Sequence, residues 1–531
     1  MAIFATQSEA SLMVDTSPLL SSMRELSSGM TVDEREIVAR QLVTLLQDYY
    51  VHLPLKRSSL GTDPVQEARL LVDDVRFLQS DEDFFRRIFD ILKRLRDRHT
   101  ALRLPSPQRD MVAYLPFAVE SYFDATGRHL IVTKIMSDVG EPSFEAGVEI
   151  SHWNGTSIRR FIENLSWDSE GANPFSRIAT TMRSLTVRPL GYMLAPREDW
   201  VTLTYLTTSG LFRNIVIPWR VYIPAATSAA GAANVTASGG VALLKGVDRS
   251  TLIVNNTWYD LFSQRGSGAG VAPSVSDTVR FKTVRSSFGG FGYIRIFSFD
   301  APDPAAFVDG FAAILRQVPQ TGVIIDIRSN PGGTIPAGEG LFALFSNRTT
   351  TPEPVSFRNT AATRRLGILP QFRQWRRSFE MQLETGEVFT QGFSLTAREP
   401  VVRGIYAGKV VLIIDALCYS TTDFFVAGMQ DNGLAKVIGI DPVTGAGGGN
   451  VWSQSLLSQF TTQSGGTDLV ALPSNIDIDI AVRRSLRVGP NEGIPVEGLG
   501  VFADHIYTLT RRDVLGENED LIEFACRVLA G

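Results

Sequence analysis

The chain has 531 residues, more than one hydrophobic core usually organises, so we expect two to four domains. Apolar residues make up 44% and charged residues 20% of the sequence, which excludes an intrinsically disordered chain. With 51 basic against 56 acidic side chains, the net charge is -5 and no basic stripe stands out, so we expect no nucleic-acid partner.

The N-terminal sequence MAIFATQSEASLMVDTSPLL has no positively charged start followed by an apolar run, so it does not read as a secretory signal. No apolar stretch of about 18 residues occurs, which predicts no membrane span. The two cysteines, Cys418 and Cys526, are too few for a disulfide scaffold or a thiolate metal cluster. We therefore expect a cytoplasmic protein, and a processed, secreted form is also compatible with the sequence.

The N-terminal part, residues 1–108, is predicted to be a helical domain, because apolar side chains recur at helical spacing in EIVARQLVTLLQDYY and DEDFFRRIFDILKRLRDRHTALRL. Residues 109–223 change to short β-rich runs such as HLIVTKIM and WVTLTYLTT, which predict a β-rich module. Residues 224–276 contain two Ala/Gly/Ser-rich stretches and are interpreted as a connector or an exposed excursion.

Strand and helix patterns alternate through residues 277–531. GYIRIFSF, PAAFVDGFAAILRQV, TGVIIDIRS, KVVLIIDAL, STTDFFVAGMQ and AKVIGI follow one another in the order that a parallel, helix-covered sheet requires. The fold class is therefore α/β, and ligand chemistry is expected in the turns beyond the strand ends.

Two of these strand ends are candidate functional sites. The first runs into Asn330-Pro331-Gly332-Gly333, where paired glycines can leave backbone N–H groups facing a ligand, although an ordinary tight turn has the same composition. At the second, a strand turns into a helix at Ser420. A serine there has an exposed hydroxyl near the positive end of the helix dipole, as a nucleophile needs, but serine is also a common N-cap residue.

Taken together, GYIRIFSFD, IIDIRSNPGG and GKVVLIIDALCYSTTDFFVAGMQDNGLAKVIG resemble the core of the carboxyl-terminal processing (tail-specific) serine peptidases. This resemblance implies a crotonase/ClpP-like α/β catalytic core with a PDZ-like β-rich module at 109–223. It assigns Ser420 as the nucleophile and Asp423 to the family's acidic position. Asp431 is expected to support the loop architecture.

One departure from that family concerns the general base. Its bacterial members carry a lysine about two dozen residues after the serine, where this chain has DPVTGAGGGN, and the remaining lysine in this region, Lys436, is expected to be structural or solvated. The Asp-x-His segment at His99 resembles the histidine-bearing region of the tricorn core protease and of the chlamydial protease-like activity factor. By this resemblance His99 is the base, and Glu497 in GIPVEGLGVFADHIY is the carboxylate that orients it.

The resemblance implies peptide hydrolysis through an acyl-enzyme, with backbone N–H groups of Gly332, Gly333 and Thr421 meeting the oxyanion. A polypeptide substrate is expected, with no metal and no organic cofactor, and a homo-oligomer is compatible with the sequence. Two alternatives stay open. One is a non-catalytic protein that binds hydrophobic ligands on the same core, and the other is a non-peptidase acyl-transfer enzyme.

Overall fold

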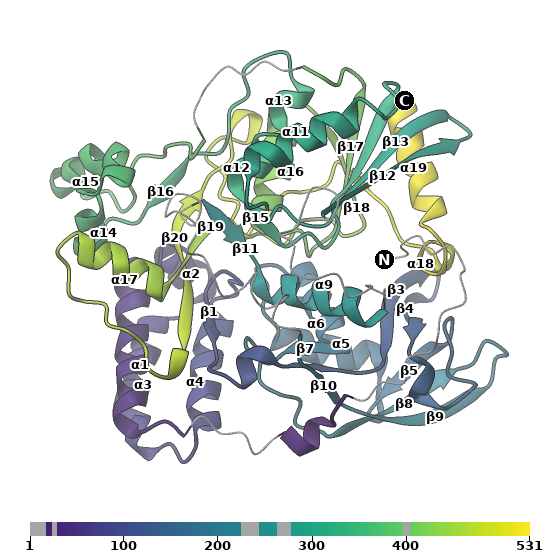
Figure 1. Ribbon diagram of the computed structural model, residues 1–531, viewed down its shortest axis with the longest axis horizontal. Coiled ribbons are helices and arrows are strands. Elements are labelled where there is room, and N and C mark those ends of the chain that lie inside the picture. The colour runs from purple at the N-terminus through teal and green to yellow at the C-terminus, as the bar shows by residue number, and fades with distance from the viewer. Residues whose placement is uncertain (1–16, 24–28, 225–243, 263–277, 397–403) are drawn as a thin grey trace.

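The computed structural model describes residues 17–23, 29–224, 244–262, 278–396 and 404–531. An N-terminal group of helices and a β-rich region lie below the α/β core in the view of Figure 1. Among the described residues, no helix is both long and apolar enough to cross a membrane. Cys418 and Cys526 are both buried as free thiols.

The N-terminal helices begin at well-formed caps. Thr31 and Glu34 form a reciprocal capping box at the start of α1, and the Ser80 hydroxyl accepts from the backbone of Asp83 at the start of α4. Both caps satisfy backbone N–H groups that a helix start leaves without partners. The helices are α1 (Val32–Thr44), α2 (Leu53–Leu60), α3 (Pro64–Asp74) and α4 (Asp81–Arg94), with a π-helical turn at Leu45–Tyr49.

These helices share one hydrophobic core with a sheet whose other strands come from the C-terminal half of the chain. Short strand β1 (Ala101–Arg103) directly follows the helices and pairs antiparallel with β20 (Asp477–Ser485), and Ala101 lies opposite Asp479. The sheet is completed by β16 (Val355–Phe357) and β19 (Gly449–Ser453), with α14 (Ala361–Leu366), α15 (Arg373–Thr385) and α17 (Gln454–Gln463) nearby. This pairing holds the segment around His99 against the C-terminal half.

The β-rich region contains a sheet in the order β3-β4-β5-β8-β9, with α5 (Ile158–Trp167) and α6 (Pro174–Ser184). The apolar side of this sheet encloses Trp153 and Trp219. Its strands are β3 (Phe117–Asp124), β4 (Gly127–Ile135), β5 (Glu149–Trp153), β8 (Trp200–Leu206) and β9 (Phe212–Pro218), and a second small sheet joins β10 (Arg220–Tyr222), β2 (Val112–Tyr114) and β7 (Val187–Pro189). The PDZ-like assignment of this region stays a prediction.

The C-terminal region confirms the predicted α/β class. Its six-stranded sheet has the order β12-β13-β14-β17-β18-β21, antiparallel between the first two strands and parallel from β13 onward. Helices α11 (Pro304–Leu315) and α16 (Thr421–Asp431) pack on one face and α19 (Glu519–Ala530) on the other. The strands are β12 (Val279–Ser286), β13 (Gly289–Ile296), β14 (Gly322–Asp326), β17 (Lys409–Ile414), β18 (Lys436–Gly439) and β21 (His505–Ile506).

The stretch 224–276, expected as a connector or excursion, has regular structure in its described part. Residues 225–243 and 263–276 lie outside the described residues, but between them are strand β11 (Lys245–Val247) and helix α9 (Arg249–Phe262). Strand β11 pairs antiparallel with β15 (Gly332–Thr334), so that Gly246 lies opposite Gly333. This part of the stretch therefore belongs to the packed interior.

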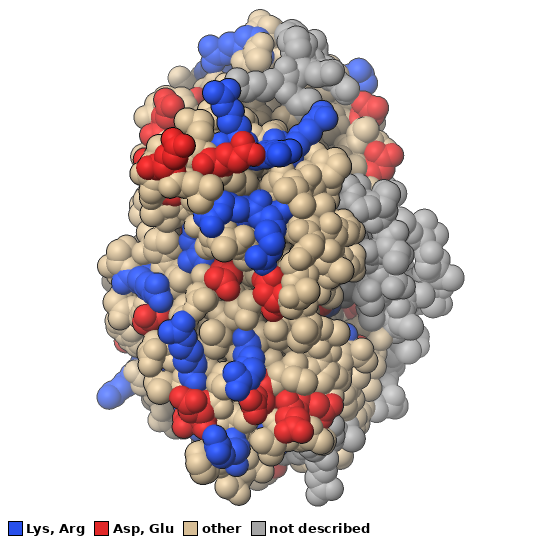
Figure 2. All heavy atoms as spheres, turned by 90° about the vertical axis from the view of Figure 1, so that its left-hand side faces the viewer, with Lys and Arg blue, Asp and Glu red and all other residues tan. Residues whose placement is uncertain are grey.

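Acidic and basic side chains are interspersed on the face shown in Figure 2. Same-helix ion pairs such as Glu36–Arg40 and Arg376–Glu380 are formed by exposed side chains. Such a face does not offer the extended basic surface that a nucleic-acid backbone requires.

Candidate active site

Ser420 lies at the turn between β17 and α16 with a strained backbone, φ 64° and ψ −122°. The side chain is 0% exposed, which corrects the expectation of an exposed hydroxyl. The physical reason is strand β11: a Cβ built on Gly246 would lie 2.4 Å from Ser420 Oγ. Ser420 occupies the N-cap position of α16 opposite Asp423, and its hydroxyl has no hydrogen-bond partner among the described residues.

The carboxylate of Asp423 holds this turn in place. It accepts hydrogen bonds from the backbone N–H groups of Ser420 and Gly447, each at 2.8 Å, and from Ala446 at 3.2 Å. Asp423 therefore ties the turn at Ser420 to the glycine loop that follows it.

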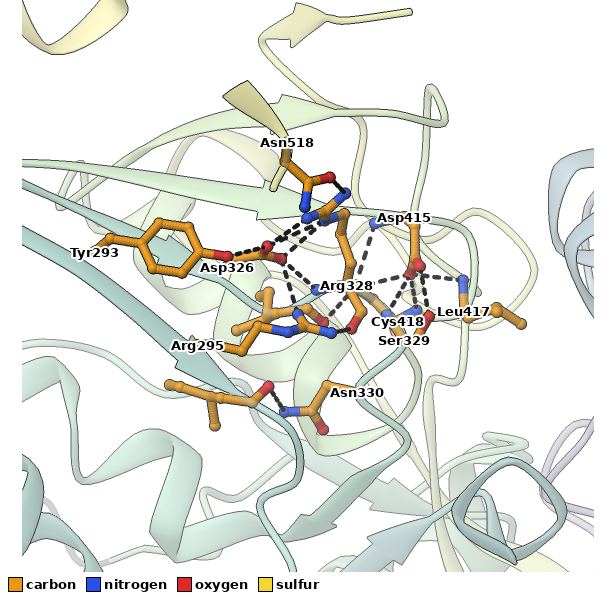
Figure 3. A network of polar contacts seen from close by, with 12 residues as sticks. Tyr293, Arg295, Asp326, Arg328, Ser329, Asn330, Asp415, Leu417, Cys418 and Asn518 are labelled. Carbon is orange, nitrogen blue, oxygen red and sulfur yellow. Dashed lines mark hydrogen bonds and ion pairs between the residues drawn. The ribbon is translucent and has the colours of Figure 1, made fainter. Parts of the chain in front are cut away.

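The loops after β14 and β17 are also joined to each other, as Figure 3 shows. Asp415 accepts from the Ser329 backbone at 2.8 Å and from the Ser329 hydroxyl at 2.9 Å, and it also accepts from the backbone N–H groups of Leu417 and Cys418. The Tyr419 N–H donates to Asn330 O. The two candidate strand ends thus form one rigid unit beside Ser420.

The three predicted oxyanion residues come together around Ser420. Gly332 and Gly333 have φ values of 94° and 151°, and a Cβ built on Gly332 would lie 2.8 Å from Ser420 Cβ. The Gly332 N–H donates to Asn330 Oδ1 at 3.0 Å, so it already has a partner inside the loop. The Thr421 hydroxyl donates to Gly333 O at 2.9 Å and Gly246 O at 3.2 Å, which holds the helix start against both strands.

His99 lies between α4 and β1 and is 1% exposed. Its ring packs against that of Tyr419, the neighbour of Ser420, with 4.6 Å between centroids. Neither ring nitrogen has a hydrogen-bond partner among the described residues, so no hydrogen bond joins His99 to Ser420 Oγ in this structure. Burial lowers the pKa of His99, while the negative charges of Asp97 and Glu497 oppose that change.

Glu497 is 1% exposed, although a glutamate in a glycine-rich loop is by default solvated. One ligand-type atom of each of Asp97, His99 and Glu497 lies within 4.8 Å of the others. Glu497 Oε1 accepts from Lys56 Nζ at 2.5 Å, and Oε2 accepts from the Gly448 N–H at 3.2 Å. The same three side chains could geometrically hold a metal ion, but the Lys56 ammonium already provides the positive charge that Glu497 requires.

The glycine loop that replaces the family's lysine loop passes between the predicted triad residues. A Cβ built on Gly447 would lie 2.7 Å from Ser420 N, one on Gly448 2.1 Å from Glu497 N, and one on Gly449 3.2 Å from His99 Nδ1. Side chains on this loop would therefore collide with the serine turn or the Glu497 backbone. This explains in steric terms why the loop is glycine-rich here.

Sequence reasoning missed that Lys56 and His52 lie beside Glu497. His52 is 2% exposed, its Nε2 lies 3.7 Å from Glu497 Oε2, and burial lowers its pKa to about 3. Both residues come from the segment around α2, where HLPLKRSSL carries no motif that signals chemistry. Asp97 accepts from the His99 backbone N–H at 2.8 Å and from the Tyr50 hydroxyl at 2.9 Å.

The remaining histidines considered above, together with Lys436 and Asp431, lie in other parts of the molecule. His129 contacts Asp124 and Glu149 on the β-rich sheet, and His152 lies on β5. His505 and Lys436 are exposed on β21 and β18. Asp431 binds Arg487, in keeping with its predicted support of the loops.

A family model described as peptidase family S41 matches residues 290–469. The fold is similar to that of mature CPAF, with 16% identity, 94% of this chain and 98% of the other covered, and a TM-score of 0.66. Mature CPAF complexed with lactacystin matches with 16% identity and a TM-score of 0.65, covering 94% of this chain and 99% of the other. The photosystem II D1 C-terminal processing protease matches with 14% identity and a TM-score of 0.40, covering 94% of this chain and 98% of the other. No curated protein sequence matches the chain.

The fold and the family match define a serine peptidase. The match to the peptidase family S41 model is to residues 290–469, about a third of the chain. This finding favours the peptidase over the ligand-binding protein and the non-peptidase acyl-transfer enzyme that the sequence left open.

Proposed function

We propose that the chain is a serine endopeptidase in which Ser420, His99 and Glu497 form the catalytic triad. The observation that carries this proposal is the set of buried polar atoms without partners. Within the described part of the chain, Ser420 Oγ and both ring nitrogens of His99 have no hydrogen-bond partner, in an interior where such atoms are usually satisfied. Their unused hydrogen-bonding capacity, next to the Glu497 carboxylate, suits groups that must exchange a proton with each other and with a substrate.

The reaction follows from these positions. Ser420 Oγ attacks the scissile carbonyl carbon while His99 takes its proton, and the Glu497 carboxylate stabilises the resulting imidazolium. The tetrahedral oxyanion accepts from the N–H groups of Gly333 and Thr421, with Gly332 shaping the loop. Collapse of this intermediate releases the amine, which takes the proton from His99, and water then hydrolyses the acyl-enzyme by the same steps in reverse order.

Strand β11 occupies the position in which an extended substrate would lie. It is hydrogen-bonded to the β15 edge and brings a backbone glycine, Gly246, against Ser420 Oγ. A polypeptide pairing with β15 would need the same edge, so β11 must leave before a substrate can reach the serine.

A cavity of about 270 Å³ lies between the β-rich region and the core. Its walls include Ser329 and Leu417 from the loops after β14 and β17 and Met182 from α6. Neither Ser420 nor strand β11 lines it, so we propose that it accommodates a part of the polypeptide substrate away from the scissile bond.

A serine-reactive fluorophosphonate probe tests the nucleophile. We include Gly246→Leu, because a larger side chain cannot fit beside Ser420 Oγ and therefore disfavours the covering position of β11. Labelling should be faster in Gly246→Leu than in the unchanged chain and should disappear when Ser420→Ala is added. If folded Gly246→Leu is neither labelled nor able to cleave casein, the proposal is wrong.

A further inference from the structure

Lys56 is a buried lysine for which the reaction described above has no role. It lies on α2 and is 3% exposed, and its ammonium donates to Glu497 Oε1 at 2.5 Å. Lysine is rarely buried this completely unless its charge is paired, and burying it costs free energy that its long side chain would avoid by reaching solvent. The position of this charge therefore calls for an explanation.

The charges around Lys56 form an unbalanced cluster. Two carboxylates, Asp97 and Glu497, lie close to the His99 ring, and the ring of His52 is also near Glu497. The phenols of Tyr50 and Tyr419 donate to Asp97, and Asp248 and Arg484 act on the two histidines from further away. With both histidines neutral, Lys56 balances only one of the two carboxylates.

Proton transfer to His99 removes this imbalance. When the imidazole accepts the Ser420 proton, the cluster contains two cations and two carboxylates. The transition state is then favoured electrostatically only if Glu497 is ionised from the start. Burial raises the pKa of Glu497, and the positive charge of Lys56 opposes this rise.

We infer that Lys56 is a positioning residue that holds the Glu497 carboxylate ionised and turned toward His99. This inference rests on the proposed triad. Lys56 contributes no proton to the reaction, because its ammonium is a donor bound to the carboxylate and a base would have to be neutral. The general-base lysine that the family carries after the nucleophile is absent from this chain. Lys56, from the N-terminal helices, instead acts on the carboxylate of Glu497.

The contacts of Glu497 also assign a different partner to each of its two carboxylate oxygens. Oε1 of Glu497 is engaged by Lys56, and Oε2 is engaged by the Gly448 N–H and lies near His52. Because each oxygen of Glu497 accepts from a different donor, the carboxylate cannot rotate freely. Its remaining lone pairs therefore keep a fixed orientation relative to His99. A lost donor would free the group to rotate or to take up a proton.

The test compares Lys56→Met, Lys56→Gln and Lys56→Arg in the full chain carrying Gly246→Leu, with a fluorogenic peptide as substrate. Lys56→Met should lower kcat about 10- to 100-fold at pH 7 and change KM little. Its kcat should recover as the pH rises, because Glu497 then loses its proton without help. Lys56→Arg should keep the pH profile of the parent, and Lys56→Gln, which retains a donor but no charge, should show the shifted profile. Lys436→Met, which removes an exposed lysine, is the control.

A double variant separates positioning from a structural role. In a Glu497→Gln background, Lys56→Met should have almost no further effect on kcat, because its target carboxylate is gone. An unshifted pH profile in both Lys56→Met and Lys56→Gln would overturn the inference. So would equal losses with and without Glu497, which indicate that Lys56 only supports folding. If Ser420→Ala or His99→Ala retains full activity, the triad itself fails, and this outcome is distinct from a silent Lys56.

Discussion

The buried carboxylate of Asp326 is fully paired, whereas the buried Ser420 hydroxyl and the His99 ring have no hydrogen-bond partners among the described residues. Asp326 accepts from Arg295 at 2.8 Å, from Arg328 at 2.6 Å and from the Tyr293 hydroxyl at 2.7 Å, and Figure 3 shows this network at the ends of the strands. Among the residues that the structure describes, Ser420 Oγ and the two ring nitrogens of His99 have no hydrogen-bond partners. The first region rigidifies the loops, and the second keeps hydrogen-bonding capacity free for a reaction.

Electrostatics separates the two regions in the same way. Burial acts to raise the pKa of Asp326, but the charges of Arg295 and Arg328 outweigh it and lower the value. Around His99, burial is the stronger influence and lowers the pKa of the imidazole. The His99 ring is therefore kept neutral, as a general base requires, whereas the Asp326 cluster is held in its charged state.

The largest expected effect on activity comes from replacing His99. His99→Ala should lower kcat about 1,000-fold or more, because no other group accepts the Ser420 proton. His52→Ala removes the neighbouring imidazole, which contacts the same carboxylate, and should lower kcat less than about 10-fold. Steady-state kinetics on the Gly246→Leu chain measures both. A larger loss of kcat in His52→Ala than in His99→Ala would identify His52 as the base.

Breaking the paired region should affect folding more than chemistry. Asp326→Asn leaves Arg295 and Arg328 buried without their counter-charge and should lower the free energy of unfolding by about 3–5 kcal/mol. Glu380→Gln, which removes an exposed ion pair with Arg376, should change it by less than about 0.5 kcal/mol. Chemical denaturation gives both values, and similar small effects would mean that the network does not stabilise the loops.

The neutral His52 should make stability sensitive to acid. Its folded pKa is about 3, below the unfolded value of 6.5, so the unfolded state binds more protons between these values. Its contribution to stability is therefore present above pH 6.5 and is lost as the pH falls toward about 3. His52→Gln should flatten this part of the pH dependence of thermal unfolding, and the exposed His505→Gln should not. An unchanged curve for His52→Gln would contradict the burial of a neutral imidazole.

The smallest expected effect is on the stability of Ser420→Ala. The Ser420 hydroxyl is buried and has no hydrogen-bond partner in the described ranges, so its removal should leave the thermal unfolding midpoint unchanged or slightly higher. Thr421→Val, one residue on, removes a hydroxyl with two acceptors and should cost about 1 kcal/mol. If Ser420→Ala is the more destabilised variant, the hydroxyl has a structural partner.

Local sequence patterns were sufficient for much of the core. The apolar runs before Asn330 and Ser420 form the parallel strands β14 and β17, and the helix after Ser420 forms as its pattern predicts. The roles of His99 and Glu497 rested on resemblance and stay predictions. Patterns did not reveal that β11, within an apparent connector, covers the nucleophile, because a three-residue strand with a glycine at its centre has no distinctive periodicity.

The sequence by itself determined the α/β class and a serine at a strand-to-helix turn, since both follow from periodicity and turn chemistry within short segments. Only the tertiary structure decided which side chains surround that serine. Lys56 reaches Glu497 because α2 packs into the same core as β20, and His99 is held by the pairing of β1 with β20. Such electrostatic contacts depend on packing between distant segments, and short-range sequence patterns do not record it.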